Sequence, residues 1–199
     1  MFRPKGLLAG LMLLLGGCAS LTPHSSPVDQ VVGRGTLQGF RFSGRLAVQQ
    51  PAGSDSGKIE WSSHGEQAHV ELLSPLGSTV AELDRTPQQV HLVLSDHSEY
   101  VAPNAEQLTQ SVLGYALPLE GLPWWVRGRA APDEGAVRFV SGPDGHPELL
   151  AQGGWIVHYG AWRDVGGESL PTALSMERDS LTIRLHIDQW VLERGESER

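Results

Sequence analysis

Apolar and polar residues alternate along much of this chain, and this period-two pattern constrains the fold more than any other feature. The clearest example runs from Leu181 to Asp188, where four apolar residues alternate with four polar ones. Successive side chains of a β-strand point to opposite faces, so such a segment places one face on an apolar interior and the other in water. Similar alternation occurs between Leu37 and Leu94 and again over Trp155–Tyr159. The pattern predicts a mainly β domain.

Turn-forming residues separate the predicted strands. Examples are Pro51–Ser54, Ser63–Gly65, Thr86–Pro87 and Gly142–Gly145, and a long loop is expected around Gly53–Lys58. Such residues favour tight turns because they supply a fixed φ, a positive φ or a local hydrogen bond. With 24 Gly and 13 Pro in 199 residues, the chain is more typical of a turn-rich, all-β domain than of a helical bundle.

One stretch in the middle of the chain interrupts the alternation. Asn104 is expected to cap a short helix that ends at Gly114, because Asn is a favoured N-cap residue and Gly a favoured helix stop. A second short helix is expected over Leu119–Arg127. Both helices are too short for a bundle and are expected to pack on an open edge of the sheet. The residues therefore predict a strongly curved antiparallel sheet with a small helical lid.

The start of the chain has the features of a bacterial lipoprotein signal. Arg3 and Lys5 precede the apolar run Leu7–Leu15, which is followed by two glycines and Cys18. A charged start, a short apolar core and small residues before a cleavage point are typical of a secretory signal, and Leu-Gly-Gly-Cys is a lipobox. The run is too short for a transmembrane helix, which needs about 20 apolar residues. An ordinary secretory signal gives no reason to place the only cysteine at the junction.

Cys18 is therefore expected to receive a diacylglyceryl group, to become the mature N-terminus and to be acylated again on its amine. Burial of acyl chains contributes about 0.8 kcal/mol per CH₂, so two or more long chains form an effectively permanent anchor. Ala19 stands where an aspartate would favour retention in the inner membrane. The periplasmic face of the outer membrane is the expected location.

The predicted boundaries follow from these features. Residues 1–17 are the expected signal peptide, which is removed, and residues 18–36 are the expected lipidated N-terminus and flexible tether, poor in large apolar groups. Residues 37–192 are expected to form a single domain, and residues 193–199 a charged tail. A domain of this length can bury a substantial core.

Net charge and cysteine content exclude several classes of function. The signal holds two of the 15 basic residues and no acidic one, so the mature chain has 13 basic against 23 acidic residues, a net charge of −10. Such a surface would be repelled by nucleic acid and by anionic headgroups, so neither electrostatic DNA binding nor a polybasic membrane patch is expected. Because Cys18 is the sole cysteine, an internal disulfide, thiol catalysis and a cysteine-based metal site are excluded.

No catalytic or metal-binding motif is found in the sequence. There is no nucleophile elbow, phosphate-binding loop, zinc-protease motif or dinucleotide fingerprint. The eight histidines lack the paired spacing of a zinc site and are expected to lie on the surface. Asp84, Asp96 and Glu99 fit solvated charges near turns better than paired catalytic carboxylates. The sequence predicts a binding protein with no catalytic residues, metal or cofactor.

A short loop between two predicted strands carries an unusual residue. Ser74-Pro75-Leu76-Gly77-Ser78 has the proline and glycine of a tight turn, with a leucine at its tip. Leu76 either folds back onto the sheet or forms an apolar finger that enters a membrane or contacts a hydrophobic partner. The sequence alone leaves both possibilities open.

Five segments, taken in order behind the lipobox, resemble the LolB family of outer-membrane lipoprotein receptors. They are Phe42–Val48, similar to the first strand of the family, Leu72–Ser78, similar to its protruding loop, Gly154–Tyr159, Leu170–Thr172 and Ile183–Val191. The resemblance implies a half-open β-barrel with a helical lid over an apolar cavity. It also implies that Pro75, Leu76 and Gly77 form the membrane-insertion loop, with Leu76 as its functional leucine, and that Cys18 is the lipidated residue.

The function implied by this resemblance is transfer of lipoproteins without chemistry. Proteins of the family accept the acyl chains of a lipoprotein from the soluble carrier LolA and place them in the inner leaflet of the outer membrane. The expected partners are a LolA-like carrier, acylated cargo and outer-membrane lipid, with the chain itself a monomer that holds only transient acyl chains. Alternation along the strands gives the expected cavity residues: Phe42, Leu46, Val48, Ile59, Trp61, Val70, Leu72, Val90, Leu92, Ile183 and Leu185.

Two other classes of function stay open at this point. One is a lipid-anchored structural or assembly protein of the cell envelope, in which the same apolar residues form a filled core. The other is an anchored hydrolase, which requires Ser, His and acidic groups to converge in a pocket. Binding of a fluorescent fatty-acyl probe separates a receptor from a structural protein.

Overall fold

The computed structural model of the protein describes residues 37–132 and 134–195. The expected signal peptide, Cys18 and the expected tether lie outside the described residues. No helix within the described ranges is long and apolar enough to cross a membrane.

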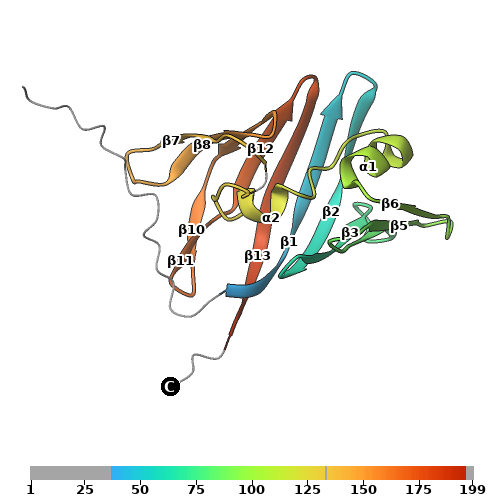
Figure 1. The fold of residues 1–199 in the computed structure, drawn as a ribbon, viewed down its shortest axis with the longest axis horizontal. Coiled ribbons are helices and arrows are strands. Elements are labelled where there is room, and N and C mark those ends of the chain that lie inside the picture. The colour runs from blue at the N-terminus through green and yellow to red at the C-terminus, as the bar shows by residue number, and fades with distance from the viewer. Residues whose placement is uncertain (1–36, 133, 196–199) are drawn as a thin grey trace, which may run out of the picture. The chain divides into compact units, whose positions relative to one another are not determined.

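The domain is built on one large antiparallel sheet of eleven strands (Figure 1). Its strands are β1 (Leu37–Gln50), β2 (Gly53–His64), β3 (Gln67–Leu73), β4 (Thr79–Arg85), β5 (Val90–Leu94), β6 (Glu99–Ala102), β7 (Arg138–Ser141), β8 (Pro147–Gln152), β9 (Trp155–Tyr159), β12 (Ala173–Arg178) and β13 (Leu181–Arg194). Their spatial order is β6-β5-β4-β3-β2-β1-β13-β12-β9-β8-β7. A separate two-stranded sheet pairs β10 (Trp162–Val165) with β11 (Glu168–Pro171). The predicted class, mainly β with a small helical part, is confirmed.

The longest strands, β1 and β13, pair at the centre of the sheet, although they begin and end the domain. Along both strands buried and exposed residues alternate, as the sequence pattern predicts. The sheet differs from the expectation in two places. The segment Gly53–Lys58, which is read from the sequence as a loop, is the first half of β2, and β13 continues to Arg194, past the expected boundary at residue 192.

Two short helices lie in the connection between β6 and β7. The first, α1 (Ala105–Leu113), begins after Asn104, whose side-chain oxygen accepts a hydrogen bond from the Gln107 amide at 2.8 Å. It ends at Gly114, which has a φ of 85° and so adopts the left-handed cap conformation. Both ends agree with the prediction. The second helix, α2 (Leu122–Trp125), is a single turn and is shorter than the predicted Leu119–Arg127.

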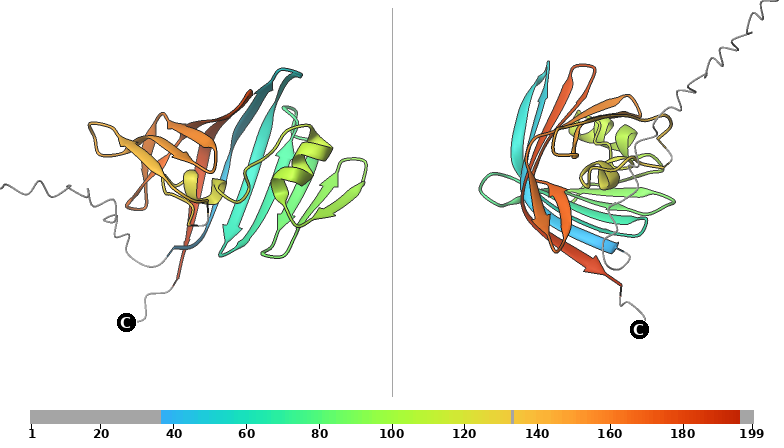
Figure 2. Two further views of the ribbon diagram at one scale, coloured as in Figure 1. Left: turned by 45° about the horizontal axis from the view of Figure 1, so that its top comes forward. Right: turned by 90° about the vertical axis from the view of Figure 1, so that its left-hand side faces the viewer.

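The helices cover one face of the sheet, and the hydrophobic core lies between the two layers (Figure 2). The core contains the inward-facing residues of the central strands together with Leu117, Leu119, Leu122 and Trp125 of the helical connection. We call residues 105–131 the helical segment, the face of the sheet that it covers the inner face, and the opposite face the outer face.

A β-bulge in the central strand pair changes which residues of β13 face inward. Ser43 pairs with Gln189 and Gly44 pairs with Ile187, so Asp188 is an extra residue on β13. Before the bulge Ile187 is buried, and after it Trp190 packs on the inner face against the ring of Phe42, with ring centroids 5.2 Å apart. Strict alternation would have placed Trp190 outward.

We expect the substitution Gly44→Ala to destabilise the domain by about 2–3 kcal/mol, the upper part of the range for an overpacked core site. A Cβ at this position would clash with the backbone oxygen of His186, which cannot move without disturbing the bulge. Ser43→Ala, on the same strand, is the control and is expected to change stability by less than about 0.5 kcal/mol. Urea unfolding of both variants checks this prediction, and equal midpoints would contradict it.

Candidate functional site

The residues predicted to line an acyl-chain cavity all lie on the inner face of the sheet. Each of the eleven is buried, and their exposed fractions range from 0% for Leu92 to 9% for Leu46. Nine come from the strands β1, β2, β3 and β13, and Val90 and Leu92 extend the same surface along β5. The structure therefore brings all the candidates into one continuous apolar layer.

The helical segment packs closely against the central part of this layer. Leu117, Pro118, Leu119 and Leu122 oppose Leu46, Ile59, Trp61 and Val70 of the sheet, together with Met176, Ile183 and Leu185, and the gap that remains between them has a volume of about 10 Å³. A gap of this size holds at most a single water molecule and no acyl chain. The indole Nε1 of Trp61, on the wall of the gap, is buried and has no hydrogen-bond partner among the described residues.

A polar cluster on one side of the domain connects α1 to the sheet. Glu106 accepts a hydrogen bond from Arg178 Nη1 at 2.7 Å and another from the indole Nε1 of Trp155 at 3.1 Å. The guanidinium of Arg178 also lies over the Trp155 ring, 4.4 Å from its centroid. The Glu106 and Arg178 side chains are 27% and 26% exposed, so partial burial strengthens this charged pair. We call these three residues the latch.

A second set of hydrogen bonds fixes the region around α2. The buried Gln152 accepts from Trp125 Nε1 at 3.1 Å and from the Ala131 amide at 2.8 Å, and it donates to the Ala131 carbonyl at 2.7 Å. The hydroxyl of Tyr159 donates to the carbonyl of Trp125 at 2.9 Å. Burial raises the pKa of Tyr159 above its usual range, so this hydroxyl keeps its proton at any physiological pH. The helical segment is thus held by few polar contacts over an apolar interface.

A second hollow, of about 400 Å³, opens beside α2 at the start of β1. Trp124, Phe40 and Arg127 line it, and Arg127 lies over both aromatic rings at 4.9 and 5.3 Å from their centroids. Burial, together with the positive charge of the neighbouring Arg129, lowers the pKa of Arg127 to about 10, and the group stays charged at neutral pH. Leu122 lines the closed gap and Trp124 lines this hollow. The single turn of α2 therefore separates them.

The loop between β3 and β4 presents Leu76 to solvent. The turn is closed by a hydrogen bond from the Gly77 amide to the Ser74 carbonyl at 2.9 Å, and Gly77 has a φ of 92° that favours glycine. Leu76 is 96% exposed, the largest exposed fraction of any large apolar residue described. The possibility that Leu76 folds back onto the sheet is therefore wrong for this structure. The loop extends from the outer face, away from the helices (Figure 2).

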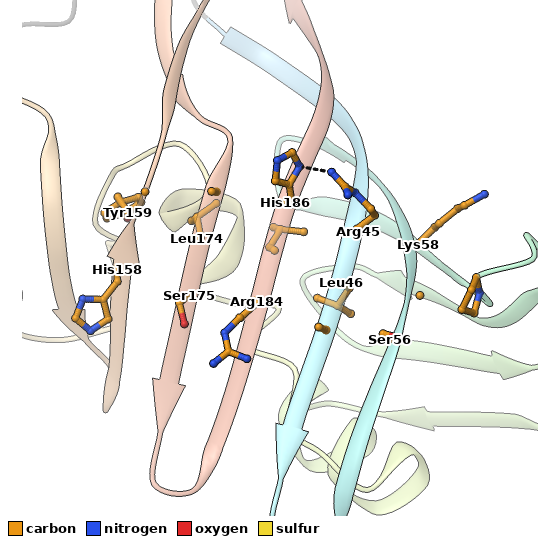
Figure 3. Close-up of a pocket in the computed structure, with 16 residues that line it drawn as sticks. Arg45, Leu46, Ser56, Lys58, His158, Tyr159, Leu174, Ser175, Arg184 and His186 are labelled. Carbon is orange, nitrogen blue, oxygen red and sulfur yellow. Dashed lines mark hydrogen bonds between the residues drawn. The ribbon is translucent and has the colours of Figure 1, made fainter.

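A groove of about 680 Å³ lies on the outer face beside this loop and was not anticipated from the sequence. Its floor is made of small and apolar residues from adjacent strands, and Pro75 of the loop forms part of its wall. Arg45, Lys58, Arg184 and His186 surround it (Figure 3). The alternation marks each of these residues as outward-facing, but only the strand register places them together.

The histidines and carboxylates elsewhere form isolated surface pairs. His69 hydrogen-bonds Asp84 at 2.7 Å, and His91 hydrogen-bonds Glu99 at 3.1 Å, in both cases at the surface. Asp96 accepts from the Ser98 amide, which holds the pKa of this exposed carboxyl below its usual value. Among the described residues no group of three or more His, Cys, Asp or Glu could hold a metal ion. The three carboxylates act as surface partners of neighbouring groups.

Known proteins with similar structures share this fold at low sequence identity. A DUF1329 family protein from Desulfovibrio piger superposes with a TM-score of 0.56 at 9% identity, covering 81% of this chain and 88% of that protein. A LolA superfamily protein from Nitrosomonas europaea gives a TM-score of 0.52 at 11% identity, covering 80% and 88%. At these identities the likeness shows the fold alone.

Sequence comparison identifies the family. A family model described as "Outer membrane lipoprotein LolB" matches residues 38–190. The outer-membrane lipoprotein LolB of Thiobacillus denitrificans is 36% identical over 189 residues, covering 94% of this chain and 97% of that protein. The LolB of Nitrosomonas europaea is 37% identical over 195 residues, covering 94% and 92%. Matches of this extent show that the chain belongs to the LolB family of outer-membrane lipoproteins.

Proposed function

We propose that this protein accepts lipoproteins from a LolA-like periplasmic carrier, holds their acyl chains between sheet and helical segment, and inserts them into the inner leaflet of the outer membrane. The observation that carries the proposal is the apolar inner layer, in which all predicted cavity residues face an apolar helical segment attached by few polar contacts. LolB proteins are lipoprotein receptors and not enzymes, in agreement with the lack of a catalytic motif in the sequence.

In this proposal the sheet acts as a half-open β-barrel and the helical segment as its lid. The gap of about 10 Å³ admits no acyl chain, so binding requires the lid to move. A bound chain then replaces Leu117, Leu119 and Leu122 against the inner face, exchanging one apolar contact for another. Opening at α2 would join the gap to the neighbouring hollow of about 400 Å³ and give the chains an entrance.

The energy for transfer comes from burial of methylene groups. Each buried CH₂ contributes about 0.8 kcal/mol, so acyl chains leave water for any sufficiently large apolar site. Because this attraction is non-directional, one site accepts many different cargo proteins. The free energy of the acyl chains then decreases from the carrier to this protein and from this protein to the bilayer, because each site binds the chains more tightly than the one before.

The closed inner face also suits a second candidate, a lipid-anchored structural protein with a filled core. The specific observation in its favour is the small volume of the gap. The two candidates differ in what happens when acyl chains are offered, because a filled core has no displaceable lid. Saturable binding of a fluorescent fatty-acyl probe, competed by unlabelled lipoprotein, supports the receptor and excludes the structural protein.

The remaining parts of the chain complete the proposal. Residues 1–17 act as the removed signal, Cys18 carries the lipid, and residues 18–36 tether the single domain to the periplasmic face of the outer membrane as a monomer. Residues 193–199 are the charged tail, whose first two residues belong to β13. The PLG loop, Pro75-Leu76-Gly77, contacts the membrane during insertion.

We expect the full chain carrying Cys18→Ala to be a soluble periplasmic protein that folds normally and removes acylated lipoprotein from a loaded carrier. The lipid holds the domain at the membrane, while acyl chains bind to the domain itself. The measurement is the distribution of cargo between the two proteins after mixing, followed by affinity capture of each. A non-acylated cargo variant is the control. Cargo that stays on the carrier, or loss of cooperative unfolding in the variant, would contradict the proposal.

A further inference from the structure

The groove on the outer face has a distinct chemical character. Its lining combines a floor of small residues, including Ala47, Gly57 and Ala173, with basic side chains from neighbouring strands. The strand register explains the cluster, because Arg45 pairs with Lys58 on one side and with His186 on the other. Arg184 and His158 each pair with Ser175 of β12, from opposite sides, and complete the second row.

Positive charge exceeds negative charge at this groove. None of the described residues that line it is acidic. Asp188, at its border, accepts a hydrogen bond from Arg45 at 3.0 Å, which together with the charge of Arg45 lowers the pKa of this carboxyl. Lys58 and Arg184 form no ion pair with any described residue, and Arg184 donates only to the neutral Gln49 at 3.2 Å. Arg45, Lys58 and Arg184 line the groove, whereas Asp188 is the one carboxylate described at its border.

This cluster stands out against the rest of the molecule, which has a formal net charge of −8. The basic side chains at the groove repel one another. Folding does not require them at these positions, since an exposed sheet face accepts many kinds of polar residue. A local positive surface with a shallow, largely apolar floor is complementary to an anionic group that carries apolar substituents. The phosphate of a phospholipid headgroup has this chemistry.

The position of the groove selects the bilayer as the source of that phosphate. Pro75, next to the exposed Leu76, forms part of the groove wall. The loop and the groove therefore share the outer face, opposite the helical segment (Figures 2 and 3). A bilayer that contacts Leu76 also presents its headgroups to Lys58, which comes from the strand that neighbours the loop.

We propose that the outer groove binds the anionic headgroup of a membrane phospholipid and orients the domain with the PLG loop toward the bilayer. The inference rests on the proposed membrane role of this loop. It adds a polar site to the apolar finger: Leu76 enters the hydrocarbon, while Lys58 and Arg184 contact phosphate at the surface. The inner face and its entrance beside α2 then stay free of the membrane.

The test is vesicle binding of the full chain carrying Cys18→Ala, so that no lipid anchor holds the protein. In co-sedimentation with vesicles of phosphatidylethanolamine and phosphatidylglycerol, Lys58→Gln combined with Arg184→Gln should lower the partition coefficient at least tenfold, since each basic residue near an anionic surface contributes about 1 kcal/mol. Arg129→Gln combined with Arg138→Gln is the control, because these exposed arginines lie in the helical segment and on β7, away from the groove, and give the same change in net charge. The control should lower binding much less.

Several outcomes would overturn the proposal. Equal losses in the two double variants would show a general charge effect instead of a site. Loss of binding in the presence of inorganic phosphate at the same ionic strength would assign the groove to the free anion. Unchanged vesicle binding together with failure to receive cargo from the carrier in solution would assign it to a protein contact. Normal uptake of a fatty-acyl probe by the Lys58/Arg184 variant separates this result from failure of the acyl-chain proposal.

Discussion

Leu76→Glu is expected to leave folding and acyl-chain uptake intact and to slow insertion of cargo into membranes at least tenfold. Burial of a leucine side chain contributes about 1.5–3 kcal/mol, and each 1.4 kcal/mol corresponds to a factor of ten. An ionised carboxylate cannot enter hydrocarbon at all without a large desolvation cost. Because Leu76 is 96% exposed and contacts no core residue, the folded domain loses nothing.

The measurement is transfer of a labelled lipoprotein from this protein to liposomes, with probe uptake measured in parallel. Val101→Glu is the matched control, since Val101 is an exposed apolar residue, 59% accessible, on the distant edge strand β6. It adds the same charge without touching the loop and should insert cargo at the normal rate. Normal insertion by the Leu76→Glu variant would reject a membrane role for the loop.

The second large effect is expected from a substitution in the latch, and it improves a functional property where Leu76→Glu impairs one. Arg178→Met should increase the apparent affinity for acyl probes by roughly fivefold to thirtyfold. A hydrogen bond to a charged group contributes about 1.5–3 kcal/mol when buried, and the partial exposure of this pair reduces that to about 1–2 kcal/mol. When only an open minority binds ligand, the apparent dissociation constant falls as the open fraction rises. Weakening the closed state therefore improves binding.

The same substitution should lower the free energy of unfolding by a similar amount, because the latch stabilises the closed protein. Glu106→Gln removes the other charge of the pair and should act in the same direction. Arg41→Met is the control: Arg41 pairs with Glu193 at 3.3 Å on the sheet and has no link to the helical segment. Probe titration and urea unfolding measure the two effects. Unchanged or weaker probe binding by a folded Arg178→Met variant would show that the lid does not open at the latch.

Several strands and helices could be predicted from the sequence because their signals lie in residues close together in the chain. The strand Leu181–Asp188 was recognisable because its period of two is a property of consecutive residues. The limits of α1 were recognisable because Asn104 and Gly114 have specific roles at helix ends. The shorter α2 was overestimated because its aromatic residues indicate burial but do not define helix ends.

The sequence by itself determined the alternating parts of the longer strands, the side of these parts that faces the core, and the eleven apolar residues that form the inner layer. Tertiary structure decided everything that depends on register between distant segments. It placed Trp190 inward through the bulge at Asp188, joined Glu106 to Arg178 across 72 positions, and assembled the basic groove from separate strands. It also decided that Leu76 points into solvent and that the inner face is closed. The physical reason is that alternation is set by bonds along one strand, whereas register, bulges and lid packing arise from the free energy of the whole domain.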